Sequence, residues 1–72
     1  MNTEKIFIDE EFIKLDSLLK FSGAAETGGQ AKLLIQSGLV YLNGEVCTQR
    51  GKKIRNGDIV RFEDKSLEVC AR

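Results

Sequence analysis

Residues 26–45, E-T-G-G-Q-A-K-L-L-I-Q-S-G-L-V-Y-L-N-G-E, constrain the fold of this chain more than any other stretch. Thr27, followed three positions later by Gln30, forms the capping-box pattern that starts a helix. Gly38 comes after the apolar positions as a residue that can end a helix with a positive φ. A short apolar run then leads to Asn-Gly at 43–44, the dipeptide best suited to a two-residue hairpin turn. The stretch therefore predicts a helix, a strand and a tight turn in succession.

The helix predicted in this stretch has two distinct faces. Ala31, Leu34 and Ile35 fall on one face, where they can pack in a core. Lys32 and Gln36 lie one turn apart on the other face. We expect this outer face to be polar and basic.

A length of 72 residues fits a single domain, covering 1–72, with a small core and modest stability. Hydrophobic residues make up 42% of the chain and charged residues 31%, which is typical of a soluble globular domain. No apolar run approaches the roughly 20 residues that span a bilayer, and the N-terminus lacks the apolar segment of a signal peptide. We therefore expect a cytoplasmic protein without a membrane partner, and nothing suggests more than a monomer.

The two cysteines, Cys47 and Cys70, lie far apart in a chain that has no histidine. A structural zinc site needs about four Cys or His ligands, so we expect no metal and no cofactor. The cysteines could face each other on neighbouring strands, but a reducing compartment disfavours a disulfide. We expect both to be small core hydrophobes.

The net charge is zero, but the charges are unevenly distributed along the chain. Residues 1–31 carry three basic and six acidic side chains, whereas residues 32–61 carry six basic and two acidic ones. A neutral total argues against a nucleic-acid partner. Because residues 32–61 are basic, a nucleic-acid partner remains a hypothesis.

The rest of the chain predicts one more helix and several short strands. Residues 1–11 are expected to form an N-terminal strand or arm, and apolar residues spaced by three and four predict a helix over about 15–21. The link between the two helices is brief, so they should pack together. The remaining expectations are a return strand at 45–47, a loop at 48–53, and strands at 59–62 and 67–69 joined by 63–66. The predicted fold class is α+β, with two short packed helices against a small antiparallel β-sheet of three to five strands.

No arrangement of residues indicates an active site. Histidine is absent, neither Cys nor Ser has a nearby base in the sequence, and the carboxylates are scattered. Glu45 and Asp58 could meet in space, although exposed acids at strand ends are the commoner explanation. The sequence therefore predicts a binding protein rather than an enzyme.

Gly28 and Gly29 open the second predicted helix, where free backbone amides attract anions. Support for a nucleotide site is weak, because no Lys-Ser/Thr pair of a P-loop follows and no strand immediately precedes. The glycines could equally allow the helix to turn tightly against its neighbour. A phosphate of a nucleic-acid backbone fits the same amides better than a nucleotide does.

Residues 50–55, R-G-K-K-I-R, place four cations in six positions. Held between strands, these cations could present a compact positive patch to a phosphate backbone. The alternative is a solvated loop that is kept polar for solubility. Tyr41 is the only exposed candidate for stacking on a base, and it could equally be packed.

Together these features resemble the RNA-binding domain named after ribosomal protein S-four, and more narrowly its stand-alone bacterial ribosome-associated members. In that family Leu-Asp opens the first helix, as it does here at 15–16. The family pattern G-x-V-x-V-N-G after the second helix is similar to G-L-V-Y-L-N-G at 38–44. A later G-D-x-V is matched by G-D-I-V at 57–60. The resemblance covers about residues 12–62, the recognised core of the domain.

The resemblance implies the αL RNA-binding motif, in which RNA is held by the second helix and by basic loops. Many family members carry Ser-Arg where this chain has Gly28-Gly29, so the usual arginine contact is missing here. Backbone amides at these glycines could take over part of the phosphate binding. Carried over by position, the resemblance nominates as RNA contacts Lys20, Thr27, Lys32, Arg50, Lys52, Lys53 and Arg55. The backbone amides of Gly28 and Gly29 complete the set of candidate RNA contacts.

These observations lead to the hypothesis of non-enzymatic binding to structured RNA, above all ribosomal RNA. The basic surface would be formed by the second helix and the loop 48–55, and the partners would include the ribosome or its assembly intermediates. Two alternatives stay open. One is a protein-interaction adaptor whose basic loop meets an acidic partner surface, and the other is a small anion- or nucleotide-binding regulator that uses Gly28 and Gly29.

Overall fold

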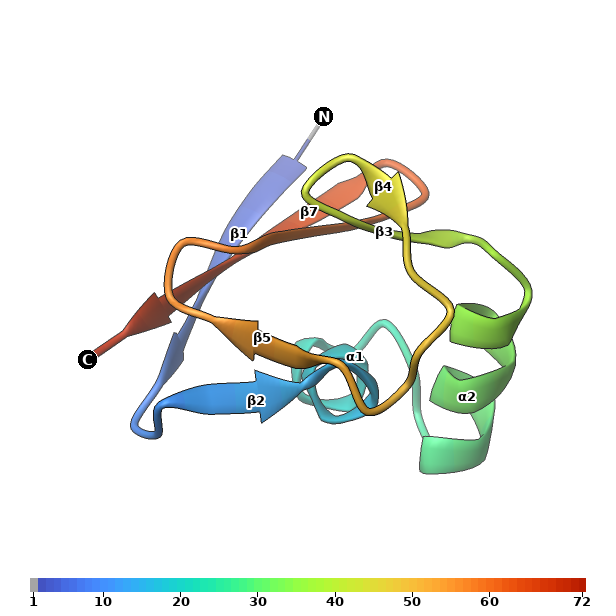
Figure 1. The fold of residues 1–72 in the computed structure, drawn as a ribbon, viewed down its shortest axis with the longest axis horizontal. Coiled ribbons are helices and arrows are strands. Elements are labelled where there is room, and N and C mark those ends of the chain that lie inside the picture. The colour runs from blue at the N-terminus through green and yellow to red at the C-terminus, as the bar shows by residue number, and fades with distance from the viewer. Residues whose placement is uncertain (1) are drawn as a thin grey trace.

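A five-stranded sheet forms one layer of the protein, and two helices with a two-stranded ribbon form the other (Figure 1). The computed structural model describes residues 2–72, so Met1 of the predicted N-terminal strand lies outside the described part. The elements in chain order are β1 (Asn2–Ile8), β2 (Phe12–Lys14), α1 (Leu15–Ser22), α2 (Gly28–Gln36), β3 (Val40–Leu42), β4 (Glu45–Val46), β5 (Lys53–Arg55), β6 (Ile59–Phe62) and β7 (Lys65–Ala71). The predicted α+β class and both helices are confirmed. Neither helix within residues 2–72 is long and apolar enough to cross a membrane.

The larger sheet has the strand order β1-β7-β6-β3-β4 and is mixed. The pairs β7–β6, β6–β3 and β3–β4 are antiparallel, as expected. Strand β1 differs, because it pairs with β7 in parallel, from Asn2 opposite Lys65 to Ile8 opposite Ala71. A parallel neighbour needs a long crossover connection, and here the whole middle of the chain supplies it.

The second sheet is a ribbon of two strands, β2 and β5, that pair in antiparallel fashion. Two expectations are corrected by the structure, that of a loop at 48–55 and that of a connection at 63–66, and strand β2 was not expected. The loop expected at 48–55 ends at Lys52, since residues 53–55 form β5, in which Ile54 is buried between two exposed neighbours. Phe12 and Ile13 continue the spacing of the helix in the sequence, yet they lie in β2 because each pairs with a residue of β5. The expected connection at 63–66 also shortens to the turn at 63–64.

The core lies between the larger sheet and the helices. Leu34 and Cys47 pack only partly against it. Cys47 and Cys70 are both free and half-buried, and Cys47 packs against the edge of the core, so neither is fully buried as a core residue would be. The fully buried large side chains, one or more from each of six elements, are Leu15, Leu18, Leu19, Ile35, Val40, Ile54, Val60 and Val69.

Helix α2 begins and ends where the sequence predicts. Thr27 is the N-cap, and its Oγ1 accepts a hydrogen bond from the Gln30 backbone N at 3.1 Å. The Gln30 side chain accepts from the Glu26 backbone N at 2.8 Å, one residue before the position of a standard capping box. Gly38 has a φ of +83° just after the helix end. Side chains of the same short segment therefore satisfy the Glu26 and Gln30 amides, while these two bonds leave the Gly28 and Gly29 amides without a side-chain acceptor.

Thr27→Ala is expected to lower the free energy of unfolding by about 1 kcal/mol, because the helix loses the acceptor for its Gln30 amide. Urea unfolding followed by circular dichroism measures this change. Thr48→Ala makes the same change at an exposed loop position and serves as the control. Equal losses in the two variants would mean that the cap contributes nothing of its own.

Candidate nucleic-acid interface

Asp58 ties strand β5 to the hairpin turn between β3 and β4. Its Oδ2 accepts a hydrogen bond from the Arg55 backbone N at 2.8 Å, and its Oδ1 accepts one from Asn43 Nδ2 at 3.1 Å. Asn43 Oδ1 accepts in turn from the Ile59 backbone N at 2.9 Å. The φ angles of 51° at Asn43 and 89° at Gly44 are those of a type I′ turn. The Asn-Gly turn thus reverses the chain and, through Asp58, also fixes the end of β5.

The loop that leads into β5 is attached to the start of helix α1. The Leu15 backbone N donates to the Lys52 carbonyl oxygen at 2.9 Å, and the Asp16 backbone N donates to the Arg50 carbonyl oxygen at 3.1 Å. The first amides of a helix have no partner within the helix, so these carbonyls satisfy two of them. The backbone of Arg50 and Lys52 is consequently held beside the first turn of α1, and both residues are exposed.

The pairing of β2 with β5 gathers cations on one face of the ribbon. Lys14 lies directly opposite Lys53, and Phe12 lies directly opposite Arg55. Ile54 points the other way and is buried in the core. The Lys53 Nζ lies 4.8 Å and the Arg55 Cζ lies 6.0 Å from the centroid of the Phe12 ring, which are cation–π distances. An aromatic ring therefore supports two of the cations from one side.

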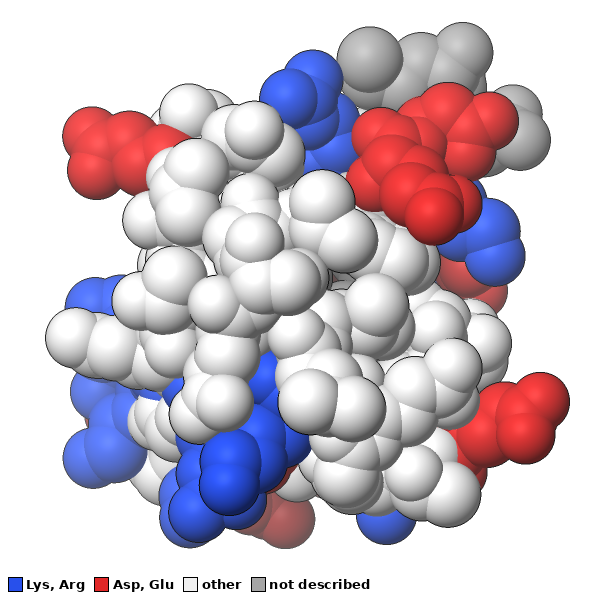
Figure 2. All heavy atoms as spheres, turned by 90° about the vertical axis from the view of Figure 1, so that its right-hand side faces the viewer, with Lys and Arg blue, Asp and Glu red and all other residues white. Residues whose placement is uncertain are grey.

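We call the exposed side chains of Lys14, Arg50, Lys52, Lys53 and Arg55 the basic ribbon. Within residues 2–72, the one ion pair closer than 4 Å joins Arg72 and Asp9, so no described carboxylate pairs with a cation of the basic ribbon. Figure 2 looks onto the side of the molecule that carries α2, and it shows Lys and Arg gathered mainly at the lower left, with further basic side chains at the top and acidic ones at the upper left, upper right and right.

The other nominated cations are exposed and come from the two helices. Lys20 lies on α1 and Lys32 on the outer face of α2. The outer face of α2 is also less basic than expected, because Lys32 is its single charge and Leu33 is 70% exposed. Figure 2 accordingly shows a broad uncharged area on this side.

Gly28 and Gly29 form the first turn of α2 and are exposed. A Cβ atom at Gly28 would meet nothing within 4 Å, and one at Gly29 would meet only the Thr27 Oγ1 at 4.0 Å. Tight packing against a neighbouring helix therefore does not explain these glycines. The amides at this helix start are open to solvent, as a phosphate contact requires.

Lys14 was missed by reasoning from the sequence. The sequence around Lys14 gives no sign of a role in RNA binding, because only the pairing of β2 with β5 brings this residue opposite Lys53. Tyr41, which was weighed as a platform for a base, is half-buried, and the Arg61 Cζ lies 4.8 Å from the centroid of its ring. The interpretation of Tyr41 as a packed residue is thus the better one.

Comparisons with known proteins agree with this arrangement. The family model of the S4 domain matches residues 6–70. YbcJ of Escherichia coli (strain K12), named as a candidate RNA-binding protein, is 41% identical over 59 residues, which cover 82% of this chain and 84% of YbcJ. RlbA of Bacillus subtilis (strain 168), named as a probable ribosome maturation protein, is 38% identical over 58 residues, covering 81% of this chain and 82% of RlbA. The solution structure of E. coli YbcJ, described as revealing an αL motif involved in RNA binding, superposes with a TM-score of 0.69 at 37% identity, over 99% of this chain and 89% of that one.

Proposed function

Because the chain belongs to the S4 domain family, we propose that it binds structured RNA, above all ribosomal RNA, without catalysing a reaction. In this proposal the chain acts in the cytoplasm as a monomer and a single domain, and RNA phosphates dock on the basic ribbon. Lys20, Lys32 and the first turn of α2, from Thr27 to Gly29, provide further contacts. The names of YbcJ and RlbA support an RNA partner connected with the ribosome.

The observation that carries this proposal is the position of Lys14 opposite Lys53. Like charges directly opposite each other on neighbouring strands destabilise a sheet. No described carboxylate lies within 4 Å of either lysine to relieve the repulsion. A phosphate placed over the pair removes that repulsion and gains two charge-assisted hydrogen bonds. The ribbon is therefore built at a cost in stability that an anionic partner offsets.

The composition of this surface indicates recognition of shape and charge rather than of base sequence. The basic ribbon offers five cations. The aromatic ring beside it, that of Phe12, is covered by Lys53 and Arg55. Tyr41 is half-buried beneath Arg61. Base stacking therefore has little to contribute. Double-stranded RNA is recognised mostly through backbone contacts and shape, which such a surface can provide.

Binding of the full chain to fragments of ribosomal RNA is expected to weaken with salt. For four or five phosphates neutralised, log affinity plotted against log salt concentration should have a slope of roughly −3 with the single-strand coefficient and roughly −4 with the duplex coefficient. Fluorescence anisotropy across a salt series measures this slope, and a DNA duplex of the same length tests whether the chain prefers RNA. Absence of binding even at low salt would refute the proposal.

A further inference from the structure

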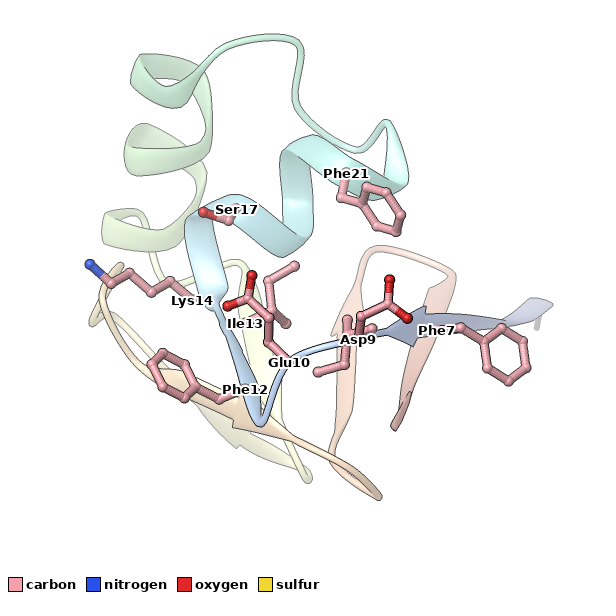
Figure 3. Close-up of a pocket in the computed structure, with 9 residues that line it drawn as sticks. Phe7, Asp9, Glu10, Phe12, Ile13, Lys14, Ser17 and Phe21 are labelled. Carbon is pink, nitrogen blue, oxygen red and sulfur yellow. The ribbon is translucent and has the colours of Figure 1, made fainter. Parts of the chain in front are cut away.

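A groove of about 580 Å³ lies between the turn that joins β1 to β2 and helix α1 (Figure 3). Phe7, Ile13 and Phe21 contribute apolar walls, and Asp9 and Glu10 contribute carboxylates. Its volume falls in the range of sites that hold a small ligand or a few side chains of a partner.

Two aromatic rings of the groove lie largely outside the core. Phe21 is 65% exposed and Phe7 is 48% exposed. Figure 3 shows Phe21 reaching from the end of α1 over the β1–β2 turn. Large exposed rings gathered around a hollow are typical of a surface that a second protein covers.

The groove is lined by two carboxylates, those of Asp9 and Glu10, and by one cation, Lys14, which it shares with the basic ribbon. The turn between β1 and β2 carries three consecutive acidic residues at 9–11. Figure 3 shows the carboxylates of Asp9 and Glu10 pointing up toward α1, while the Lys14 amino group lies at the far end and points away from them. Such a surface repels phosphate and attracts cations. The guanidinium of the chain's own Arg72 already lies 3.6 Å from the Asp9 carboxylate.

We propose that this groove docks a basic segment of a second protein. An aliphatic or aromatic side chain of that segment packs against Phe7 and Phe21, and its Arg or Lys side chains pair with Asp9 and Glu10. Phe12 lines the groove and also supports Lys53 and Arg55, so the groove and the basic ribbon meet at this ring. The chain thereby joins a basic protein segment on one surface to a polyanion on the adjacent one.

A peptide that alternates arginine with leucine serves as the probe, titrated into the full chain and followed by fluorescence anisotropy. Glu10→Lys and Phe21→Ser should each weaken peptide binding at least about fivefold, as for a residue that anchors an interface. Both side chains are exposed, so the variants should fold, and circular dichroism verifies this. Peptides with glutamine for arginine, or with serine for leucine, should each bind more weakly than the parent.

Glu63→Lys provides the matched control, since it makes the same charge change at the turn between β6 and β7. Strand β7 runs from this turn to Ala71, so the control lies at the other end of a strand of about 20 Å. The proposal is overturned if the peptide does not bind, if Glu63→Lys weakens it as much as Glu10→Lys, or if the peptide without leucine binds equally well. Self-association of the chain that Phe21→Ser abolishes would also overturn it, in favour of a second copy as occupant. RNA affinity should not fall in Glu10→Lys, which separates this test from that of RNA binding.

Discussion

Replacing Lys52, Lys53 and Arg55 together with glutamine is expected to weaken RNA binding about a hundredfold at about 0.1 M salt. Each phosphate that is no longer neutralised makes the salt slope shallower by roughly 0.7 for a single strand, so three such phosphates make it shallower by about 2. Glutamine is preferable to alanine because the charged ends of Lys53 and Arg55 lie over the Phe12 ring, and a glutamine side chain is long enough to cover part of that ring. Anisotropy titrations over a salt series give both the affinity and the slope.

Substitution of Lys5, Lys65 and Arg72 with glutamine removes the same number of charges outside the basic ribbon and is the control. All three side chains are exposed, and the Arg72–Asp9 pair contributes little at the surface. RNA affinity should fall far less in this variant than in the first. If both triple variants bind RNA equally weakly, binding depends on net charge alone, and the basic ribbon is not the RNA site.

Ile54→Ala is expected to lower the free energy of unfolding by about 3 kcal/mol. Ile54 has no exposed surface and lies between Lys53 and Arg55 on β5, so its side chain holds the basic ribbon against the core. Alanine removes apolar packing and leaves a cavity, and a small domain has a total stability of only about 5–15 kcal/mol. Urea unfolding measures the loss, and RNA titrations of the folded variant show whether the basic ribbon has loosened.

Ile59→Ala deletes the same atoms from a side chain that is 44% exposed, which makes it the matched control. Its backbone hydrogen bond to Asn43 does not depend on the side chain, so this variant should lose less than about 1 kcal/mol. A loss at Ile54 as small as that at Ile59 would show that β5 is not anchored by its buried residue.

Local patterns in the sequence were enough to predict both helices and the turns that follow α2. Thr27 caps its helix through a hydrogen bond to a residue three positions away, and Asn43 adopts its positive φ within a two-residue turn. Each of these features depends on a few neighbouring residues, and the free energy that selects it is local. This is why the order of helix, strand and hairpin could be derived without knowledge of the rest of the chain.

Pairing between distant segments was the part that the sequence could not provide. The segment at 12–14 has the apolar spacing of a helix, and β5 has a single apolar residue, so neither indicates a strand until the other lies beside it. Lys14 joins the candidate RNA site only through this pairing. The same holds for the groove, because Phe7 and Phe21 come from two segments that are brought together by tertiary packing.

The parallel pairing of β1 with β7 also bears on how the chain folds. The helices and the two hairpins join residues that are close in sequence, whereas β1 reaches its partner only across almost the whole chain. Closing so long a loop loses the most chain entropy, so we expect β1 to dock last. Until it docks, β7 is an uncovered edge of seven residues. This edge is where two partly folded chains can exchange their first strands.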